Sequence, residues 1–227
     1  MQTFVLDYLK NRAEMIQCWR DLRKVRGVRD VSTLVGFAFN HCICPVQVYS
    51  ELIEFMQTVA SIKPSAALEI GTHRGGTLFL LCRLADPRAK IISTDLPHGR
   101  FGGGYKRVRI GLYRKFADEG QSLHLLRQDS HKQETVGCIK DILCGASLDY
   151  LFIDGDHSYE GVRHDFEVYS PLVRRGGLVA FHDIAGNGTQ WGCGVPRFWS
   201  EVKSRYLYRE IIANPKQEGN GVGLLRL

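Results

Sequence analysis

Carboxylate and histidine side chains recur in this sequence directly after short apolar runs. They form five groups, namely Glu69, Asp95, Asp129 with Ser130, the segment from Asp154 to His157, and His182 with Asp183. One such acid is commonly only a helix cap, but five groups after five runs favour a shared ligand site. Carboxylates can accept hydrogen bonds from hydroxyl groups or hold a cation, and a histidine can move a proton. The residues therefore predict a ligand site with metal or acid–base chemistry.

The elements between these groups alternate between apolar runs and helical patterns. Strands are expected at 66–70, 90–94, 123–126, 148–153 and 178–181, and helices at 77–84, 106–118, 132–143 and 161–173. This alternation predicts a parallel sheet covered by helices on both faces. Residues 208–213 and 222–227 read as an antiparallel hairpin at the sheet edge. The predicted fold is a Rossmann-like, doubly wound α/β domain with a mostly parallel, seven-stranded sheet, whose ligands bind at the carboxyl ends of the strands.

The first 60 residues are expected to form a helical cap on the same domain, with the core at 61–227. Residues 2–25 have the apolar spacing of an amphipathic helix. A looser stretch follows, and Pro45 opens a second helical pattern that contains Leu52, Phe55 and Val59. The apolar N-terminal helix is also a candidate interface, so a homo-oligomer remains open.

Composition limits the class of protein. The chain has 227 residues, 44% of them hydrophobic, and 30 Lys and Arg against 24 Asp and Glu, which is typical of a globular protein. No apolar run reaches about 18 residues, so we expect no membrane-spanning helix. Seven scattered cysteines do not suggest a disulfide framework, and the charged N-terminus does not suggest a secretory signal. We expect a cytoplasmic protein.

The turn after the first expected strand indicates the kind of cofactor. It reads Glu69-x-Gly71-x-x-x-Gly75, and its glycines let the backbone approach a ligand closely. A dinucleotide needs free backbone N–H groups for its pyrophosphate, which an acid beside the turn opposes. S-adenosylmethionine (SAM) carries a sulfonium, an ammonium and a ribose but no phosphate. The acids at 69 and 95 therefore favour SAM over NAD.

Five segments resemble class I SAM-dependent methyltransferases. They are ALEIGTHRGGTLFLL, STDLPHGRFGGGY, LHLLRQDSH, the long segment from Leu148 to Ile184, and GVPRFW. The resemblance is to a bacterial family related to cephalosporin-biosynthesis methyltransferase/hydroxylase proteins and macrolide-sugar O-methyltransferases, and more distantly to catechol O-methyltransferase. It covers about residues 45–204 and is most specific from Asp149 to Asp183.

The resemblance implies roles for the residues that match the family's motifs. The methionine end of SAM is assigned to Glu69, Gly71, Thr72, His73, Gly75 and Thr77. Asp95 is assigned to the ribose, and Asp129 and Ser130 to the surroundings of the adenine. Asp154 is placed where the methyl donor and the acceptor meet.

The resemblance also implies a divalent cation such as Mg²⁺, held in relatives by three oxygen ligands. Asp154 and Asp183 match two of these positions, with His182 at the third and Asp156 as an alternative. Mg²⁺ prefers oxygen ligands, so a histidine departs from the pattern. Two readings stay open: a cation on Asp154, His182 and Asp183, or a metal-independent site in which His157 is the catalytic base.

These observations predict a SAM-dependent methyltransferase that acts on a hydroxyl of a small molecule, such as a sugar, a phenol or a natural-product precursor. A basic cluster from His98 to Lys115 favours an anionic acceptor, and residues 97–109, with three glycines at 102–104, are expected to form a mobile lid. Nucleic acid and membrane are not expected as partners. The alternatives are a methyltransferase for RNA or another polymer, an iron-dependent hydroxylase that uses His157, His182 and Asp183, and a SAM-binding protein without activity.

Overall fold

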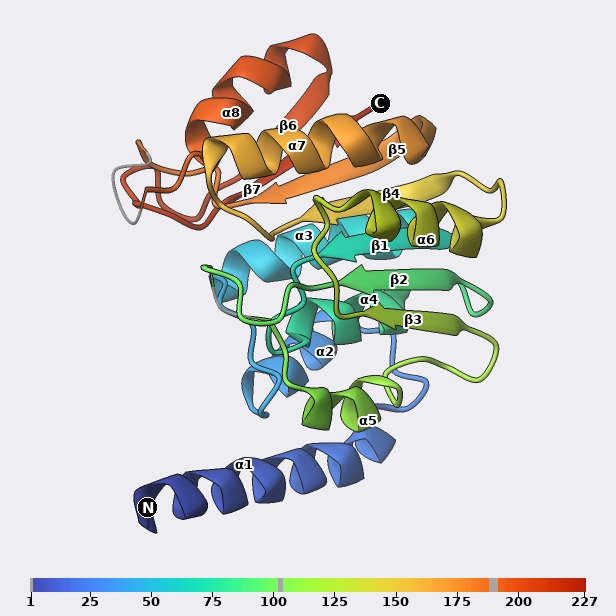
Figure 1. The fold of residues 1–227 in the computed structure, drawn as a ribbon, viewed down its shortest axis with the longest axis vertical. Coiled ribbons are helices and arrows are strands. Elements are labelled where there is room, and N and C mark those ends of the chain that lie inside the picture. The colour runs from blue at the N-terminus through green and yellow to red at the C-terminus, as the bar shows by residue number, and fades with distance from the viewer. Residues whose placement is uncertain (1, 102–103, 188–191) are drawn as a thin grey trace.

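A central sheet lies between two layers of helices in the computed structural model, which describes residues 2–101, 104–187 and 192–227 (Figure 1). The sheet has seven strands in the order β3-β2-β1-β4-β5-β7-β6. Their bounds are β1 Ala66–Ile70, β2 Lys90–Thr94, β3 Ser122–Leu126, β4 Leu148–Ile153, β5 Val173–His182, β6 Leu207–Ile211 and β7 Val222–Arg226. Strands β1 to β5 are parallel, and β7 and β6 are antiparallel additions beside β5. The predicted fold class is confirmed.

Helices cover both faces of this sheet. On one face lie α2 (Val31–Phe39), α3 (Tyr49–Ile62) and α4 (Gly76–Leu84), and on the other α6 (Gln133–Leu143), α7 (Tyr159–Tyr169) and α8 (Val195–Val202) (Figure 1). In β4, Tyr150 and Phe152 pack in the core under the first group, whereas Leu151 and Ile153 pack under the second. This period of two is what a strand buried on both faces requires.

The N-terminal segment shares its core with the sheet. Helix α1 (Gln2–Asp21) continues as a short 3₁₀ helix, η1 (Leu22–Val25), and Figure 1 shows α1 at the end of the molecule opposite α8. Cys18, Leu22 and Leu34 are buried in the same cluster as Phe79 of α4. This packing joins part of the N-terminal segment to the core beside α4, and the assignment of residues 1–60 to the same domain stays a prediction. Within the described parts of the chain, no helix is long and apolar enough to cross a membrane.

One helix was missed, and two of the expected helices have other bounds than predicted. The stretch after residue 25 contains helix α2, which begins where the Asp30 side chain accepts a hydrogen bond from the backbone N–H of Thr33 at 2.8 Å. The helix expected at 161–173 ends at Tyr169, because Pro171 lies in a 3₁₀ turn, η3 (Ser170–Leu172), and β5 begins at Val173.

The helix expected at 106–118 is reduced to the 3₁₀ turn η2 (Arg107–Arg109) and the four-residue α5 (Ile110–Tyr113). Two side chains of this segment bind neighbouring loops: Arg109 donates to the carbonyl of Cys42 at 3.0 Å, and the Tyr113 hydroxyl donates to the carbonyl of His73 at 2.9 Å. Tertiary contacts of this kind outweigh weak local helix propensity.

A buried carboxylate joins the N-terminal helices to the C-terminal hairpin. Glu51 of α3 is 2% exposed and accepts hydrogen bonds from the backbone N–H groups of Ala213 at 2.8 Å and Gly221 at 2.9 Å, and from the Gln217 side chain at 2.7 Å. All three donors belong to the connection between β6 and β7. This connection also carries residues 218–220, which line the cavity described below.

Removing the Glu51 carboxylate should therefore destabilise the protein. Glu51→Ala leaves buried N–H donors without a partner, and we expect it to lower the free energy of unfolding by about 2–4 kcal/mol, measured by denaturant unfolding. The matched control is Glu54→Ala on the same helix, whose partner Arg209 is 57% exposed, so the loss there should be less than about 1 kcal/mol. Equal losses for both variants would contradict this account.

Candidate functional site

The carboxyl ends of β1, β2, β4 and β5, and the residues that follow β3, border two adjoining cavities. The larger cavity, about 510 Å³, is bordered by the turn after β1, the ends of β4 and β5, residues 45–47 and 218–220, and Cys193 and Pro196. The smaller cavity, about 220 Å³, is bordered by residues 94–96, 99–101, 128–131 and 154–156. Gly71, His73, Arg100, Phe101 and Asp154 line both. The cavities therefore meet above the ends of β1 and β4.

The structure brings nearly all of the predicted site residues to these cavities. The larger one is lined by Gly71, Thr72, His73, Gly75, Thr77, Asp154, His157, His182 and Asp183. The smaller one is lined by Gly71, His73, Asp95, Asp129, Ser130 and Asp154. Of the predicted set, only Glu69 lies outside both linings.

The turn after β1 depends on the absence of side chains at two positions. Gly71 has a φ of +93°, and a Cβ atom there would lie 1.9 Å from the backbone oxygen of Asp154. Gly75 has a φ of +87°, and its Cβ would lie 2.7 Å from the ring of Tyr113. Any larger residue would separate β1 from β4 or push the turn into the cavity. The turn can therefore lie against a ligand only because these residues are glycines.

Asp95 fixes this turn from the end of β2. Its Oδ2 accepts hydrogen bonds from the backbone N–H groups of His73 at 2.8 Å and Tyr105 at 3.2 Å. Burial raises the pKa of this carboxyl to about 6, although both hydrogen bonds act in the opposite direction. Asp95 is thus a partly desolvated acceptor in the wall of the smaller cavity.

Glu69 occupies a different environment from the one expected. It is 1% exposed and shares the α4 side of β1 with Ala67, because residues two apart in a strand point the same way. Burial raises its pKa to about 8, so the carboxyl is mostly protonated at neutral pH. The structure does not bring this side chain to the cavity surface, and a neutral Glu69 supplies no negative charge to a cationic ligand.

The residues after β3 are held by local hydrogen bonds. Asp129 Oδ1 accepts from the backbone N–H of His131 at 2.9 Å, and the carbonyl of Ser130 accepts from the Tyr169 hydroxyl at 2.6 Å. Both residues still line the smaller cavity. These hydrogen bonds fix the position of Asp129 and Ser130 in the wall of the smaller cavity, beside Asp95.

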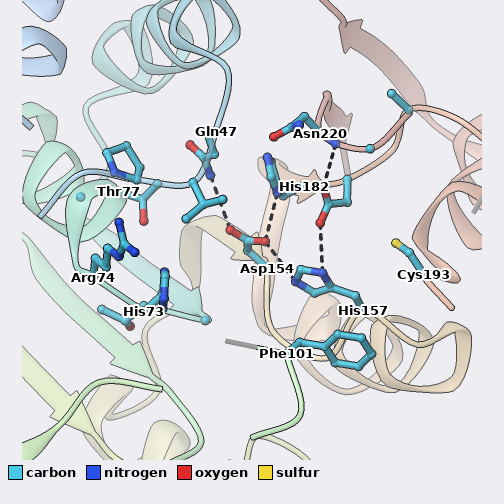
Figure 2. A pocket seen from close by; sticks show the side chains of 18 of the residues that line it. Gln47, His73, Arg74, Thr77, Phe101, Asp154, His157, His182, Cys193 and Asn220 are labelled. Carbon is cyan, nitrogen blue, oxygen red and sulfur yellow. Dashed lines mark hydrogen bonds and ion pairs between the residues drawn. The ribbon is translucent and has the colours of Figure 1, made fainter. Parts of the chain in front are cut away.

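Two carboxylates and two histidines meet at the ends of β4 and β5 (Figure 2). Asp154 Oδ1 lies 3.4 Å from Nε2 of His157 and 3.2 Å from Nδ1 of His182. Asp183 lies 3.0 Å from Nδ1 of His157 through Oδ2 and 3.4 Å from Nδ1 of His182 through Oδ1. Each histidine thus contacts both carboxylates, and we call these four residues the histidine–carboxylate cluster.

Charge pairing within this cluster changes the expected role of His157. Burial alone would lower the pKa of His157, but hydrogen bonds to Asp154 and Asp183 raise it to about 10. Burial would likewise raise the pKa of Asp183, but His182 and His157 hold it far below its ordinary value. In this arrangement His157 holds a proton at neutral pH and is not free to accept one from a substrate.

Asp183 has a left-handed backbone conformation, with a φ of +59°. Its Oδ1 also accepts a hydrogen bond from the backbone N–H of Asn220 at 2.8 Å. A non-glycine residue in this region is strained, and such strain concentrates at functional positions. The surrounding structure holds this carboxylate in one orientation.

Four further residues border the cluster. Gln47 Nε2 lies 3.5 Å from Asp154 Oδ2, and the Phe101 ring stacks on the His157 ring at 5.1 Å with a 10° interplanar angle. Cys193 and Asn220 approach from the other side (Figure 2). Sequence reasoning singled out Phe101 as a ring that could cover a ligand. It missed the other three, because they come from loops that no motif connects to the strands.

The expected lid is described only in part, because Gly102 and Gly103 lie outside the described residues. Of its aromatic residues, Phe101 reaches the cavity, whereas Tyr105 is 3% exposed and packs against Tyr113 at 5.1 Å between ring centres. Arg109 is bound to the carbonyl of Cys42. Tyr105 and Arg109 therefore belong to the body of the protein, and closure by this segment stays a prediction.

The cluster offers ligands of a kind that divalent cations accept. One ligand atom each from Asp154, His182 and Asp183 lies within 4.8 Å of the other two. Two carboxylate oxygens with one imidazole nitrogen suit a cation such as Mn²⁺ better than Mg²⁺. Asp156, the alternative ligand, is not in this group, because its Oδ1 accepts from the backbone N–H of Ser158 at 2.9 Å where α7 begins.

Comparison with known proteins decides the family. Residues 68–184 match the family described as "Methyltransferase domain", which is more than half of the chain. The chain belongs to the methyltransferase domain family. The matched residues run from β1 to just beyond the end of β5, so they include the turn at Gly71 and the whole histidine–carboxylate cluster.

Two curated relatives of this methyltransferase-domain chain are uncharacterized proteins. Protein y4gI of Sinorhizobium fredii is 28% identical over 74% of the chain and 18% of its own length. Protein R132 of Acanthamoeba polyphaga mimivirus is 32% identical over 51% of the chain and 50% of its own length. The chain thus spans at most about half the length of the curated relatives it matches.

Solved structures of methyltransferases have the same fold. One is the O-methyltransferase TomG of Streptomyces achromogenes in complex with SAM, with a TM-score of 0.57 and 15% identity over 91% of this chain and 95% of TomG. Another is the MycE methyltransferase of the mycinamycin biosynthetic pathway in complex with Mg and SAH, with a TM-score of 0.56 and 16% identity over 87% of this chain and 54% of MycE. These similarities confirm the Rossmann-like methyltransferase fold.

The glycine at position 71 should be indispensable to this methyltransferase-domain fold. In Gly71→Ala the new Cβ would collide with the Asp154 backbone at a φ that alanine avoids, so we expect a loss of about 3 kcal/mol or more in unfolding free energy. The control is Gly137→Ala in α6, where nothing lies within 4 Å of the new Cβ and helix propensity improves. A Gly71→Ala variant with unchanged thermal unfolding would contradict the close approach.

Proposed function

We propose that this chain transfers a methyl group from SAM to a hydroxyl oxygen of a small molecule. The observation that carries the proposal is the meeting of two cavities at Gly71 and Asp154. The smaller cavity offers Asp95, Asp129 and Ser130 to a nucleoside, and the larger one has room for a second molecule beside the histidine–carboxylate cluster. A cofactor that spans both would present its reactive group at the junction.

The residues at the junction fit SAM in particular. The hydrogen bonds from His73 and Tyr105 both go to Oδ2 of Asp95, and a carboxylate can accept about four, so Asp95 has capacity for ribose hydroxyls. At Gly71 and Gly75 the turn presents backbone without a side chain to the methionine part of the cofactor. The structures of TomG and MycE contain SAM and SAH, which supports the same cofactor here. Thr72, His73 and Thr77 complete the wall around the methionine end.

The proposed mechanism rests mainly on alignment. SAM is an activated methyl donor, so the protein has to hold the acceptor oxygen in line with the methyl carbon and exclude water. Phe101, stacked on His157, closes one side of the junction. Asp154, His182 and Asp183 would hold a divalent cation, which lowers the pKa of a bound hydroxyl. Protonated His157 would keep Asp154 and Asp183 oriented.

The acceptor is proposed to be anionic. Arg74 and Arg100 line the larger cavity, and within the described part of the chain neither guanidinium forms an ion pair with an acid. Arginine pairs well with carboxylate and phosphate groups, so a carboxylated or phosphorylated sugar or a related natural-product precursor suits these positions. The proposal includes a relationship to the cephalosporin-biosynthesis and macrolide-sugar methyltransferases. It also includes a cytoplasmic location.

Replacing Asp95 should test cofactor binding. We expect Asp95→Asn to weaken binding of S-adenosylhomocysteine (SAH) about ten- to a hundredfold by calorimetry, because charge-assisted hydrogen bonds to the ribose are lost. Asp141→Asn, an exposed acid on α6, should bind SAH like the wild type. Equal SAH affinities for the Asp95 and Asp141 variants would remove Asp95 from the site.

The pH dependence of binding follows from the raised pKa of Asp95. Ribose hydroxyls donate to the ionised carboxylate, so SAH affinity of the wild type should fall as the pH drops below about 6. Asp95→Asn cannot titrate and should show a flat profile between pH 5 and about 7. Calorimetry at several pH values measures both profiles. A wild-type affinity that is constant over this range would contradict the account.

The cation can be tested separately from the cofactor. Mn²⁺ should bind the wild type in calorimetry, and Asp183→Asn should abolish that binding while SAH still binds. The rate at which SAM is converted to SAH can be measured in the presence of a panel of anionic hydroxyl compounds. Excess chelator should lower this rate, and Mn²⁺ should restore it. Absence of Mn²⁺ binding together with full turnover in chelator would remove the cation from the mechanism.

A further inference from the structure

A thiol forms part of the cavity wall beside the histidine–carboxylate cluster. The sulfur of Cys193, a nitrogen of His157 and a carboxylate oxygen of Asp183 all lie within 4.8 Å of one another. All three residues line the larger cavity, and Figure 2 shows Cys193 next to the His157 ring. This group differs from the set Asp154, His182 and Asp183, and the two share only Asp183.

His157 and Asp183 already face each other, and a cation bound between them would replace the proton that His157 otherwise holds. Nδ1 of His157 lies 3.0 Å from Oδ2 of Asp183, while Nε2, the other ring nitrogen, faces Oδ1 of Asp154 at 3.4 Å. A carboxylate behind a histidine is the usual outer partner of a metal-binding imidazole. Oδ1 of Asp183 is held by the backbone N–H of Asn220, which leaves Oδ2 directed at His157 and away from Asn220.

The ring of His157 is held in place as well. Phe101 stacks on it at a centroid distance of 5.1 Å. Protein zinc sites that do chemistry use three protein ligands, among them cysteine, histidine and carboxylate, and leave a fourth position open. The Cys193 group has three such ligands, and all three residues line the larger cavity, from which a fourth ligand could come.

We propose that Cys193, His157 and Asp183 form a second cation site, selective for a thiophilic ion such as Zn²⁺. Thiolate and imidazole ligands favour Zn²⁺, whereas the neighbouring set with two carboxylates favours a harder cation. Because both sets use Asp183, occupation of one changes the other. In the proposed methyl transfer, a hydroxyl at the open position would be polarised by Zn²⁺. The assignment itself rests on the donor geometry and does not depend on that reaction.

Cobalt(II) is the probe that reports the sulfur ligand directly, because thiolate–Co²⁺ bonds give a charge-transfer band in the near ultraviolet. Co²⁺ added to the metal-free full chain should produce this band, and Zn²⁺ should displace it. Cys193→Ser should abolish the band, with circular dichroism as the check of folding. The matched control is Cys144→Ser, an exposed cysteine outside the cavity, which should keep the band. Asp154→Asn removes the outer partner of His157 and leaves Cys193, His157 and Asp183 in place, so the Co²⁺ concentration needed for the thiolate band should rise about ten- to a hundredfold.

A second measurement uses the wild-type protein, so its result does not depend on whether the Cys193 variant folds. Zn²⁺ should slow alkylation of Cys193 at least about tenfold in a mass-spectrometric assay, because a metal-bound thiolate is protected, while Cys144 should react at an unchanged rate. No Co²⁺ band in the wild type, a band that survives Cys193→Ser, or unprotected Cys193 would overturn the proposal. SAH calorimetry is independent of all three results, so failure of this site and failure of the proposed methyl transfer remain distinguishable.

Discussion

The contact between the backbone at Gly71 and the carbonyl of Asp154 is the constraint on which the site depends. It sets the ends of β1 and β4 against each other, with no room for a Cβ atom between them. The turn after Gly71 is bound to Asp95 by the hydrogen bond from the backbone N–H of His73. The end of β4 is bound to the end of β5 by the contacts of His182 with Asp154 and Asp183. Gly71 and Asp154 line both cavities, so the close approach of these two residues forms the boundary between the larger and the smaller cavity.

Much of the fold could be predicted because strand signals here are local. The buried strands at 66–70, 90–94 and 148–153 have the expected bounds, since short apolar runs between turn residues identify them. The errors lie where distant contacts or a single proline decide the structure. Pro171 ends α7 early, and Arg109 and Tyr113 bind other loops in place of extending α5. A single sequence does not show such partners.

The site was predicted through its position at the strand ends, and that principle does not require knowledge of side-chain packing. It does not separate a residue that faces the cavity from one beside it, so Glu69 was expected to face a ligand but lies under α4 with its pKa raised by burial. It also does not find Gln47, Cys193 and Asn220, which loops bring in from distant parts of the chain. Nor does it give the protonation of His157, which depends on two carboxylates at once.

The central claim is that one SAM molecule spans both cavities across Gly71. Hydrogen–deuterium exchange of the full chain with and without SAH tests this most directly, because it reports every backbone segment in one experiment. The account predicts ligand protection at residues 71–77, 94–96 and 128–131, with no change in β6 at the far edge of the sheet. Protection confined to other segments, or none at saturating SAH, would contradict it.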